Sequence, residues 1–187
     1  MKEIKLNLGC GEAKLEGFIN IDSEPSVNPD LLYDMRSSPL PYENNSVDVI
    51  HWIHSIEHFQ YTSWPTILSG FHKILKPEGL LVLAYPEWKI CALNFINNFQ
   101  GKKNFWRATL YGRQLYPSDF HISPVESKDL VVILADVGFK DIKHKPEEYE
   151  PHNTFLTCHK DGDFKAPRDQ EDLINEEVFR HFNDTNI

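Results

Sequence analysis

Short apolar runs alternate with polar loops through the first half of the chain. The runs are rich in Leu, Ile and Val, and turn residues or a helical pattern separate one run from the next. Short β-rich runs separated in this way are typical of a parallel sheet joined by crossovers. The pattern therefore predicts an α/β fold. The predicted strands cover residues 4–8, 18–21, 31–33, 47–53 and 80–85.

Two further segments carry apolar residues at helical spacing. The first covers residues 64–75, where Ser63 can cap the helix and Pro65 is tolerated in the first turn. The second is predicted to begin at a capping box in residues 123–126, with Pro at the first helical position, and to end at Gly138.

The second helix is followed by two more predicted strands, in residues 139–143 and 154–158. Residues 1–160 are therefore expected to form one domain. Residues 161–187 form a charged tail with a single amphipathic pattern. That pattern favours a terminal helix that docks on the domain rather than a site for a partner protein.

Composition and charge argue against several classes of function, among them indiscriminate nucleic-acid binding and membrane insertion. The chain has 187 residues, of which 41% are hydrophobic and 12% aromatic, and a formal net charge of -9. The acidic balance argues against indiscriminate binding to nucleic acid or to an anionic membrane. We expect neither a signal peptide nor a membrane span, because a strand pattern starts almost at Met1 and no apolar stretch approaches about 18 residues. Three scattered cysteines without CxxC spacing favour the cytoplasm.

The richest chemical signal lies at the end of the first predicted strand. There the chain runs into Gly9, Cys10 and Gly11, and the next strand ends at Asp22. Gly-x-Gly after a strand lets a ligand approach the backbone, because no Cβ blocks the way. A carboxylate at the end of the next strand can accept hydrogen bonds from both hydroxyls of a ribose. Together they predict a pocket for an adenosine-type cofactor.

Several pieces in order extend this signal over residues 5–143, and the chain there resembles a class I S-adenosylmethionine (SAM)-dependent methyltransferase of the small type 11-like group. The resemblance implies a Rossmann-like, mostly parallel, seven-stranded sheet with an antiparallel last strand and helices on both faces. The pieces are Leu6–Gly11, Ile19–Asp22, Asp34-Met35, Leu40–Asp48, Ile56-Glu57-His58 and Leu75–Gly79.

The same resemblance assigns cofactor roles to individual positions. It implies that Asp22 holds the ribose hydroxyls and that Asp34 and the backbone of Met35 meet the adenine. Ile53 and His54 would lie beside the methionine portion. The residues implied to line the methionine and ribose side, largely through backbone groups, are Asn7, Leu8, Gly9, Cys10 and Gly11.

The chain departs from the family pattern at three points. Asn7 stands where an acid is common, so the SAM ammonium must be recognised by an amide oxygen or by backbone carbonyls. Ala13 replaces the third loop glycine. The interval between Gly11 and Asp22 is short, so the first crossover has room for only a turn or two of helix. This short interval weakens a dinucleotide interpretation more than a SAM interpretation.

Methyl transfer from a sulfonium requires alignment of the nucleophile and, for some acceptors, removal of a proton. Ligands bind at the carboxyl ends of the strands in such sheets, which makes His54, His58 and His121 the candidate bases, in that order. Glu57, Tyr85 and Glu87 occupy similar strand ends. We expect no metal at His51, His54 and His58, because strand geometry points His51 and His54 to opposite faces.

Residues 89–122 are expected to form an insertion that overhangs the pocket as a lid. The segment is dense in aromatic residues and carries five basic side chains against a single acid, Asp119. Arginine matches phosphate or carboxylate, and aromatic faces stack on rings, which favours an anionic or sugar-like small-molecule acceptor. The alternative is a helical excursion with solvated charges and core aromatics.

Two rival functions remain open at this stage. One is a NAD-dependent oxidoreductase or nucleotide-sugar epimerase, but Lys14 stands at the last position of the Gly-x-Gly-x-x-Gly pattern and the chain has no Tyr-x-x-x-Lys pair. The other is a non-catalytic partner subunit that keeps the fold. The sequence favours a SAM-dependent methyltransferase that acts on an oxygen or nitrogen atom. The acceptor and the oligomeric state cannot be read from it.

Overall fold

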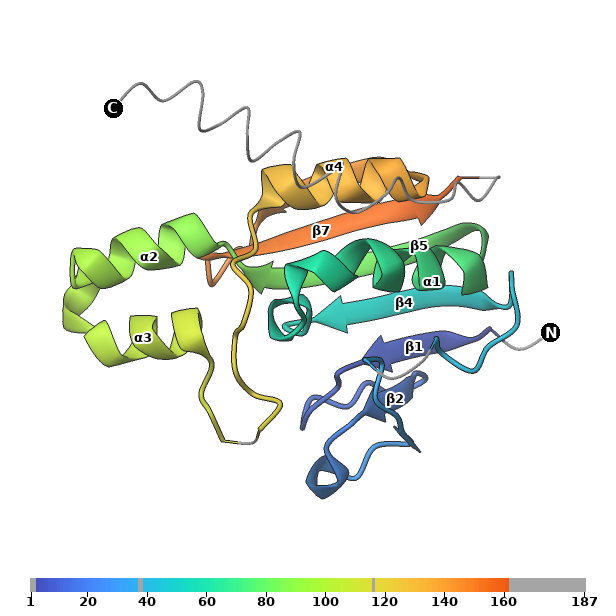
Figure 1. The fold of residues 1–187 in the computed structure, drawn as a ribbon, viewed down its shortest axis with the longest axis horizontal. Coiled ribbons are helices and arrows are strands. Elements are labelled where there is room, and N and C mark those ends of the chain that lie inside the picture. Colours follow the sequence, from blue (N-terminus) through green and yellow to red (C-terminus); the bar gives the residue numbers. More distant parts are fainter. Residues whose placement is uncertain (1–2, 37–38, 116, 162–187) are drawn as a thin grey trace.

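The computed structural model describes residues 3–36, 39–115 and 117–161, and its centre is one seven-stranded sheet (Figure 1). The strands are β1 (Lys5–Leu8), β2 (Ile19–Asp22), β3 (Leu31–Leu32), β4 (Val47–Ile53), β5 (Leu75–Pro86), β6 (Phe139–Pro146) and β7 (Asn153–Lys160). The α-helices are α1 (Trp64–Ile74), α2 (Trp88–Ile96), α3 (Lys103–Tyr111) and α4 (Ser127–Val137). Short 3-10 turns are η1 (Pro25–Val27), η2 (Ile56–His58), η3 (Tyr61–Ser63) and η4 (Phe99–Gly101).

The strand order confirms the Rossmann-like prediction. It reads β3-β2-β1-β4-β5-β7-β6. Pairing is parallel from β3 through β5, whereas β7 runs antiparallel to both β5 and β6. Strands β2 and β3 follow on one side of β1, and β4 and β5 follow on its other side, so the strand order reverses between β1 and β4. Ligands of such sheets bind at this switch point.

One face of the sheet carries the core beneath α1 and α4 (Figure 1). Leu8 of β1 pairs in register with Trp52 of β4, and both side chains are fully buried. The Trp52 indole packs against Phe59 at 5.4 Å and against Phe71 of α1 at 5.0 Å, measured between ring centroids. Side chains alternate along a strand, so the residues next to Leu8 and Trp52 in sequence point to the opposite face of the sheet.

The opposite face differs from the expectation of helices on both faces. Right-handed crossovers place the connections after β1 and β2 on that face, since they run toward the other sheet edge. Residues 9–18 contain turns but no helix, not even the expected turn or two, and residues 23–30 contain only η1. The short chain between Gly11 and Asp22 explains the difference. Phe18 covers His51 there, with ring centroids 4.7 Å apart.

The start of α4 was predicted wrongly. The helix begins at Ser127, because Glu126 is extended (φ -118°, ψ 132°). The residues of the supposed capping box serve other elements. Ser123 Oγ accepts a hydrogen bond from the Tyr61 backbone N–H, and the Val125 carbonyl accepts one from the N–H of Trp88. Contacts distant in sequence therefore outweigh the local helix signal.

Two smaller expectations also need correction. Ser63 stands at the start of α1 but makes no capping hydrogen bond, because its hydroxyl donates to the carbonyl of Gln60. Strand β5 begins at Leu75 rather than at Leu80, with an irregular register between its two ends. Glu78 within that stretch has a positive φ of 63°.

None of the helices in the described ranges is long and apolar enough to cross a bilayer. The predicted docking helix of the tail lies in residues 162–187, outside the described residues.

A buried lysine ties the end of β7 to the end of α1. Lys160 is 4% exposed, and its ammonium donates to Asn45 Oδ1 at 2.7 Å and to the Leu75 carbonyl at 2.9 Å. Burial lowers the pKa of this lysine. The bonds join the antiparallel hairpin to the helix that flanks the switch point, because a cation near a helix C-terminus satisfies its free carbonyls.

We expect Lys160→Met to lower the free energy of unfolding by about 1–3 kcal/mol, because oxygens that the ammonium satisfies lose their buried donor. Lys143→Met, at an exposed position of the adjoining strand β6, is the matched control and should change stability little. Urea unfolding of both variants measures the difference. Equal stability of the two variants would contradict this role for Lys160.

Candidate functional site

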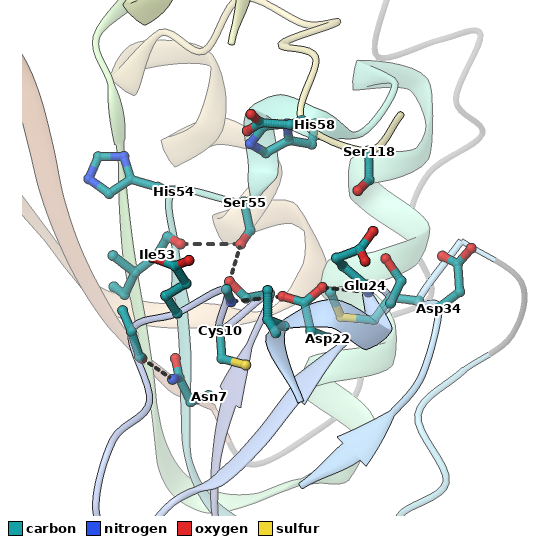
Figure 2. Close-up of a pocket in the computed structure, with 18 of the residues that line it drawn as sticks. Asn7, Cys10, Asp22, Glu24, Asp34, Ile53, His54, Ser55, His58 and Ser118 are labelled. Carbon is teal, nitrogen blue, oxygen red and sulfur yellow. Dashed lines mark hydrogen bonds between the residues drawn. The ribbon is translucent and has the colours of Figure 1, made fainter. Parts of the chain in front are cut away.

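A cavity of about 500 Å³ opens at the carboxyl ends of β1, β2 and β4 (Figure 2). That volume falls within the range of small-molecule sites. Figure 2 shows Cys10 and Asp22 side by side in one wall, with His58 and Ser118 across the cavity from them. The location matches the switch point of the sheet, where strand ends leave the backbone accessible.

The loop after β1 depends on glycine at Gly9. Its φ is +63°, and a Cβ there would overlap Ser55 Oγ. Ser55 follows β4, and its hydroxyl lies within hydrogen-bonding distance of the carbonyls of Leu8 and Ile53. Gly11 has φ +49° with open space where a Cβ would stand. The first glycine thus lets two strand ends approach, and the second leaves room in the cavity.

Asp22 joins the loops after β1 and β2. One carboxylate oxygen accepts the Gly11 N–H at 2.8 Å, and the other accepts the Glu24 N–H at 2.9 Å. Each oxygen retains a further lone pair for a ligand hydroxyl. The carboxylate is therefore held in place at the cavity wall and can still accept hydrogen bonds there.

Asn7 organises the same loop from below. Its side chain is buried, and its amide nitrogen donates to the Ala13 carbonyl at 3.0 Å and to Asn20 Oδ1 at 2.9 Å. Asn20 Oδ1 also accepts the Leu15 N–H. An amide can donate where a carboxylate cannot, so asparagine at this position closes the short loop through its NH₂ group.

The far end of the cavity is formed by residues around β3. Asp34, Met35 and Tyr33 line it. Asp34 accepts two hydrogen bonds from the Arg36 guanidinium, at 2.9 and 3.0 Å, and this partner lowers the pKa of the carboxyl. Asp34 therefore faces the cavity as an anion whose orientation Arg36 fixes.

The lining carries more acid than base. Its acidic side chains are Glu12, Asp22, Glu24, Asp34 and Asp119, and its basic ones are Arg36 and Arg113. Such a wall favours a cationic ligand and disfavours one with several phosphates, because like charges at close range repel.

Most of the residues assigned to the cofactor from sequence line this cavity, and Leu8 does not. The lining includes Asn7, Gly9, Cys10, Gly11, Asp22, Asp34, Met35, Ile53 and His54. The Leu8 side chain points into the core and is fully buried. Burial, with Asp22 nearby, raises the pKa of the Cys10 thiol to about 11. Cys10 is thus a neutral lining residue and a poor nucleophile at neutral pH.

The three candidate bases gather around Glu57. His54 and His58 line the cavity, whereas His121 lines a smaller one together with Glu57. Glu57 Oε1 lies 3.7 Å from His54 Nδ1 and 3.9 Å from His121 Nε2. The backbone brings His121 here, because the Glu57 carbonyl accepts the N–H groups of Ile122 and Ser123.

Burial and charge oppose each other in this cluster. Burial raises the pKa of Glu57, but the three histidines around it lower that pKa by more than burial raises it. The net shift of the Glu57 pKa is therefore down. For His54, burial lowers the pKa while Glu57 raises it, and the net direction is up. For His121 burial wins, and its pKa is lowered. Glu57 is therefore a buried carboxylate that stays ionised.

The expected lid segment contributes one wall of the cavity through its last part. Arg113, Leu115, Ser118 and Asp119 line the cavity. In α3, Phe105 and Trp106 instead pack against each other, with ring centroids 4.9 Å apart. None of the described aromatics of this segment lines the cavity, and stacking on an acceptor ring is not supported.

Sequence reasoning missed several lining residues, among them Ser55, Phe59 and Glu24. Ser55 follows His54 directly, so its place after a parallel strand was the available signal. Glu24 lies two residues after Asp22 and carried the same signal. Arg113 and Ser118 lay within the predicted overhang, but nothing in the pattern distinguished them from their neighbours.

A family model described as a methyltransferase domain matches residues 10–144 of this chain. The matched residues include the glycine loop from Cys10 onward, Asp22 and the histidine cluster. No curated protein matches the chain in sequence.

Solved structures share the fold at low identity. A SAM-dependent methyltransferase from Archaeoglobus fulgidus is 17% identical, with a TM-score of 0.58 over 84% of this chain and 86% of that one. A SAM-dependent methyltransferase from Methanosarcina mazei is 15% identical, with a TM-score of 0.58 over 87% and 95%. A chain from the complex of the Trm112 methyltransferase activator with a methyltransferase of Haloferax volcanii is 12% identical, with a TM-score of 0.59 over 88% and 84%. At such identities the likeness shows the fold.

We expect Gly9→Ala to destabilise the protein more than Gly17→Ala by about 1 kcal/mol or more, through overlap with Ser55. Both glycines have positive φ, so each substitution carries the backbone strain of a left-handed residue, about 1–2 kcal/mol. A Cβ added at Gly17 would meet no neighbour within 4 Å, so that variant isolates the backbone cost. Thermal unfolding of the two variants, and of Gly9→Ala combined with Ser55→Ala, measures the overlap. A double variant no more stable than Gly9→Ala would contradict the close approach.

Proposed function

Because this chain belongs to the methyltransferase domain family, we propose that it transfers the methyl group of SAM to an oxygen or nitrogen atom of a small anionic or sugar-like acceptor. The observation that carries the proposal is the acidic cavity at the switch point, with Gly11 open to it and Asp22 fixed in its wall. A methyltransferase is an enzyme whose cofactor supplies the reactive group. The protein must therefore bind, orient and shield.

The cavity fits SAM in three respects. The sulfonium and ammonium of SAM suit a wall with five acids and two arginines. Asp22 offers free lone pairs for the two ribose hydroxyls, and the open side of Gly11 leaves room for the cofactor beside the backbone. The same acidic wall disfavours the pyrophosphate of NAD.

The proposed cofactor contacts follow the order of the elements. Asp22 binds the ribose, and Asp34 with Met35 binds the adenine at the β3 end. The glycine loop, with Asn7 beneath it, faces the methionine portion, and Ile53 and His54 flank that portion from β4. Leu8 contributes through its carbonyl, which accepts from Ser55, and not through its side chain.

The transfer itself needs alignment and a place for a proton. The bond between the SAM sulfur and its methyl carbon breaks as the bond from that carbon to the acceptor atom forms. S-adenosylhomocysteine leaves, and a proton of the acceptor passes to a nearby base. We place this base among His54 and His58, which line the cavity, while His121 stands behind Glu57.

The anionic character of the acceptor rests on Arg113. Among the lysines and arginines of residues 89–122 that the structure describes, Arg113 lines the cavity. Its side chain is 70% exposed. Asp119 Oδ2 lies 3.9 Å from its guanidinium, which leaves donors free for a ligand. By contrast, Arg107 and Lys103 lie over the ring of Phe95. An acceptor phosphate or carboxylate would meet Arg113 on its way to the methyl group.

We expect Asp22→Asn to weaken binding of S-adenosylhomocysteine about 10- to 100-fold, because hydrogen bonds to a charged acceptor contribute about 1.5–3 kcal/mol. Asparagine keeps one oxygen for the loop. The matched control is Asp30→Asn, since Asp30 also accepts hydrogen bonds from this loop region, through Asn20, but does not line the cavity. Calorimetry should show unchanged affinity for the control. Equal loss in both variants would contradict ribose binding by Asp22.

We expect Arg113→Ala to raise the KM for anionic acceptors about tenfold, because the acceptor would lose one exposed, charge-assisted hydrogen bond. The affinity for S-adenosylhomocysteine should not change. Arg107→Ala is the matched control, because its guanidinium lies over Phe95. Transfer of labelled methyl from SAM to a panel of phosphorylated, carboxylated and neutral hydroxyl and amino compounds measures both. Transfer to neutral members of the panel alone would contradict an anionic acceptor.

A further inference from the structure

We propose that Glu57, His58 and His121 form a binding site for a divalent transition-metal ion of the zinc class, at the acceptor end of the cavity. One ligand atom from each residue lies within 4.8 Å of the other two. Two of the three residues follow β4 in η2, and the third comes from the loop before α4. Backbone hydrogen bonds from Ile122 and Ser123 to the Glu57 carbonyl hold the two segments together.

The first observation behind the proposal is the state of Glu57. The residue is 2% exposed, and neither of its carboxylate oxygens has a hydrogen-bond partner. The closest ion-pair contacts, to His54 Nδ1 and His121 Nε2, are 3.7 and 3.9 Å long. A buried carboxylate without hydrogen bonds is costly, so such a group needs a cation near it. The contact distances are too long for direct hydrogen bonds to fill that need.

The second observation is the orientation of the two imidazoles. His58 Nδ1 lies 3.0 Å from the Phe120 carbonyl oxygen, and His121 Nδ1 lies 2.9 Å from that of Thr109. A carbonyl can only accept, so Nδ1 carries the proton in both rings. Each Nε2 then keeps its lone pair. Metal-binding histidines are held in this way, with the second nitrogen donating to a carbonyl or carboxylate.

The donor set determines the kind of ion. Two imidazole nitrogens and one carboxylate oxygen suit zinc and neighbouring transition metals, whereas calcium and magnesium prefer oxygen ligands. Three protein ligands leave a position open, as in catalytic rather than structural zinc sites. The cluster therefore has the composition of a site that also binds a small molecule.

One of the three ligands connects the cluster to the methyl-transfer cavity. His58 lines that cavity, while Glu57 and His121 line the smaller one. Figure 2 shows His58 across the cavity from Asp22. This part of the inference rests on the proposed function: an acceptor oxygen at the open position would lie beside the methyl group. His58 and His121 then act as ligands, which leaves His54 as the proton acceptor.

This site differs from the histidine set considered in the sequence. His51 lies on the other face of the sheet, against Phe18, and takes no part. His121 is distant in the chain and had no spacing signal linking it to Glu57. The interval between the two is 64 residues by position number, so only the folded chain shows the set.

The test uses tag-free, full-length protein that has been treated with a chelator and then titrated with Zn²⁺ or Co²⁺ alone, without SAM. We expect one ion per chain by calorimetry, and an X-ray absorption spectrum with imidazole and carboxylate ligands. Glu57→Gln and His121→Ala should each weaken Zn²⁺ binding by about 100-fold or more, since even outer-shell changes cost 10- to 100-fold. Should Glu57→Gln fail to fold, His58→Ala gives the same loss from a half-buried position.

His51→Ala is the matched control, because it removes a histidine from β4 without touching the cluster. It should bind Zn²⁺ as tightly as the unaltered chain. The inference is overturned if neither ion binds stoichiometrically, or if the site variants keep full affinity. It is also overturned if His51→Ala weakens binding as much as they do.

The readout separates this inference from the proposed function. A protein that binds S-adenosylhomocysteine and transfers methyl groups, but binds neither ion, overturns the metal site and leaves the methyltransferase activity standing. A protein that binds Zn²⁺ through the cluster but does not bind S-adenosylhomocysteine supports the metal site and overturns the proposed function.

Discussion

The carboxylate of Asp22, held by the N–H groups of Gly11 and Glu24, fixes the wall of the cavity that the loops after β1 and β2 form. It ties together two loops that leave adjacent parallel strands at the switch point of the sheet. Neither loop contains an α-helix that could hold it rigid, because the connection is too short. Side-chain hydrogen bonds from Asn7 and Asn20 take over that task. The shape of the ligand site thus depends on a few polar contacts rather than on a packed crossover helix.

The sheet supplies the rigid base for these contacts. Its core on the α1 and α4 side is dense, with Trp52 and Leu8 fully buried, while its other face is more open around His51. An acidic cavity stands on this base, and the histidine cluster around Glu57 closes one end. Charge is therefore divided along the cavity. In the proposed function, the carboxylates after β2 and β3 meet the cationic cofactor, and the acceptor meets the imidazoles and Arg113, beside which Asp119 lies.

The features that neighbouring residues determine, such as strand limits and the glycine loop, could be predicted from sequence. Strand β4 was predicted with its observed limits, because a run rich in Val, Ile and Trp stands between polar turn residues. The glycine loop and Asp22 were also predicted, since positive φ and a strand-end carboxylate leave marks in the sequence. Leu8 was expected to contribute largely through its backbone, and its side chain lies in the core, because alternation turns it away from the cavity that its neighbours line.

Long-range contacts account for the rest. The helix signal at residues 123–126 failed because Tyr61 and Trp88 use those residues as hydrogen-bond partners. His121 was named from its type and place in the order of elements, but its position behind Glu57 follows from backbone pairing that no spacing encodes.

The most direct test of SAM binding at the switch point is a crystal structure of the protein with S-adenosylhomocysteine. We expect the ribose hydroxyls within hydrogen-bonding distance of Asp22, the homocysteine portion over residues 9–11, and the sulfur directed toward the side of the cavity that His58 lines. Ligand density at another place, or side chains filling the space beside Gly11, would contradict this assignment of the cavity.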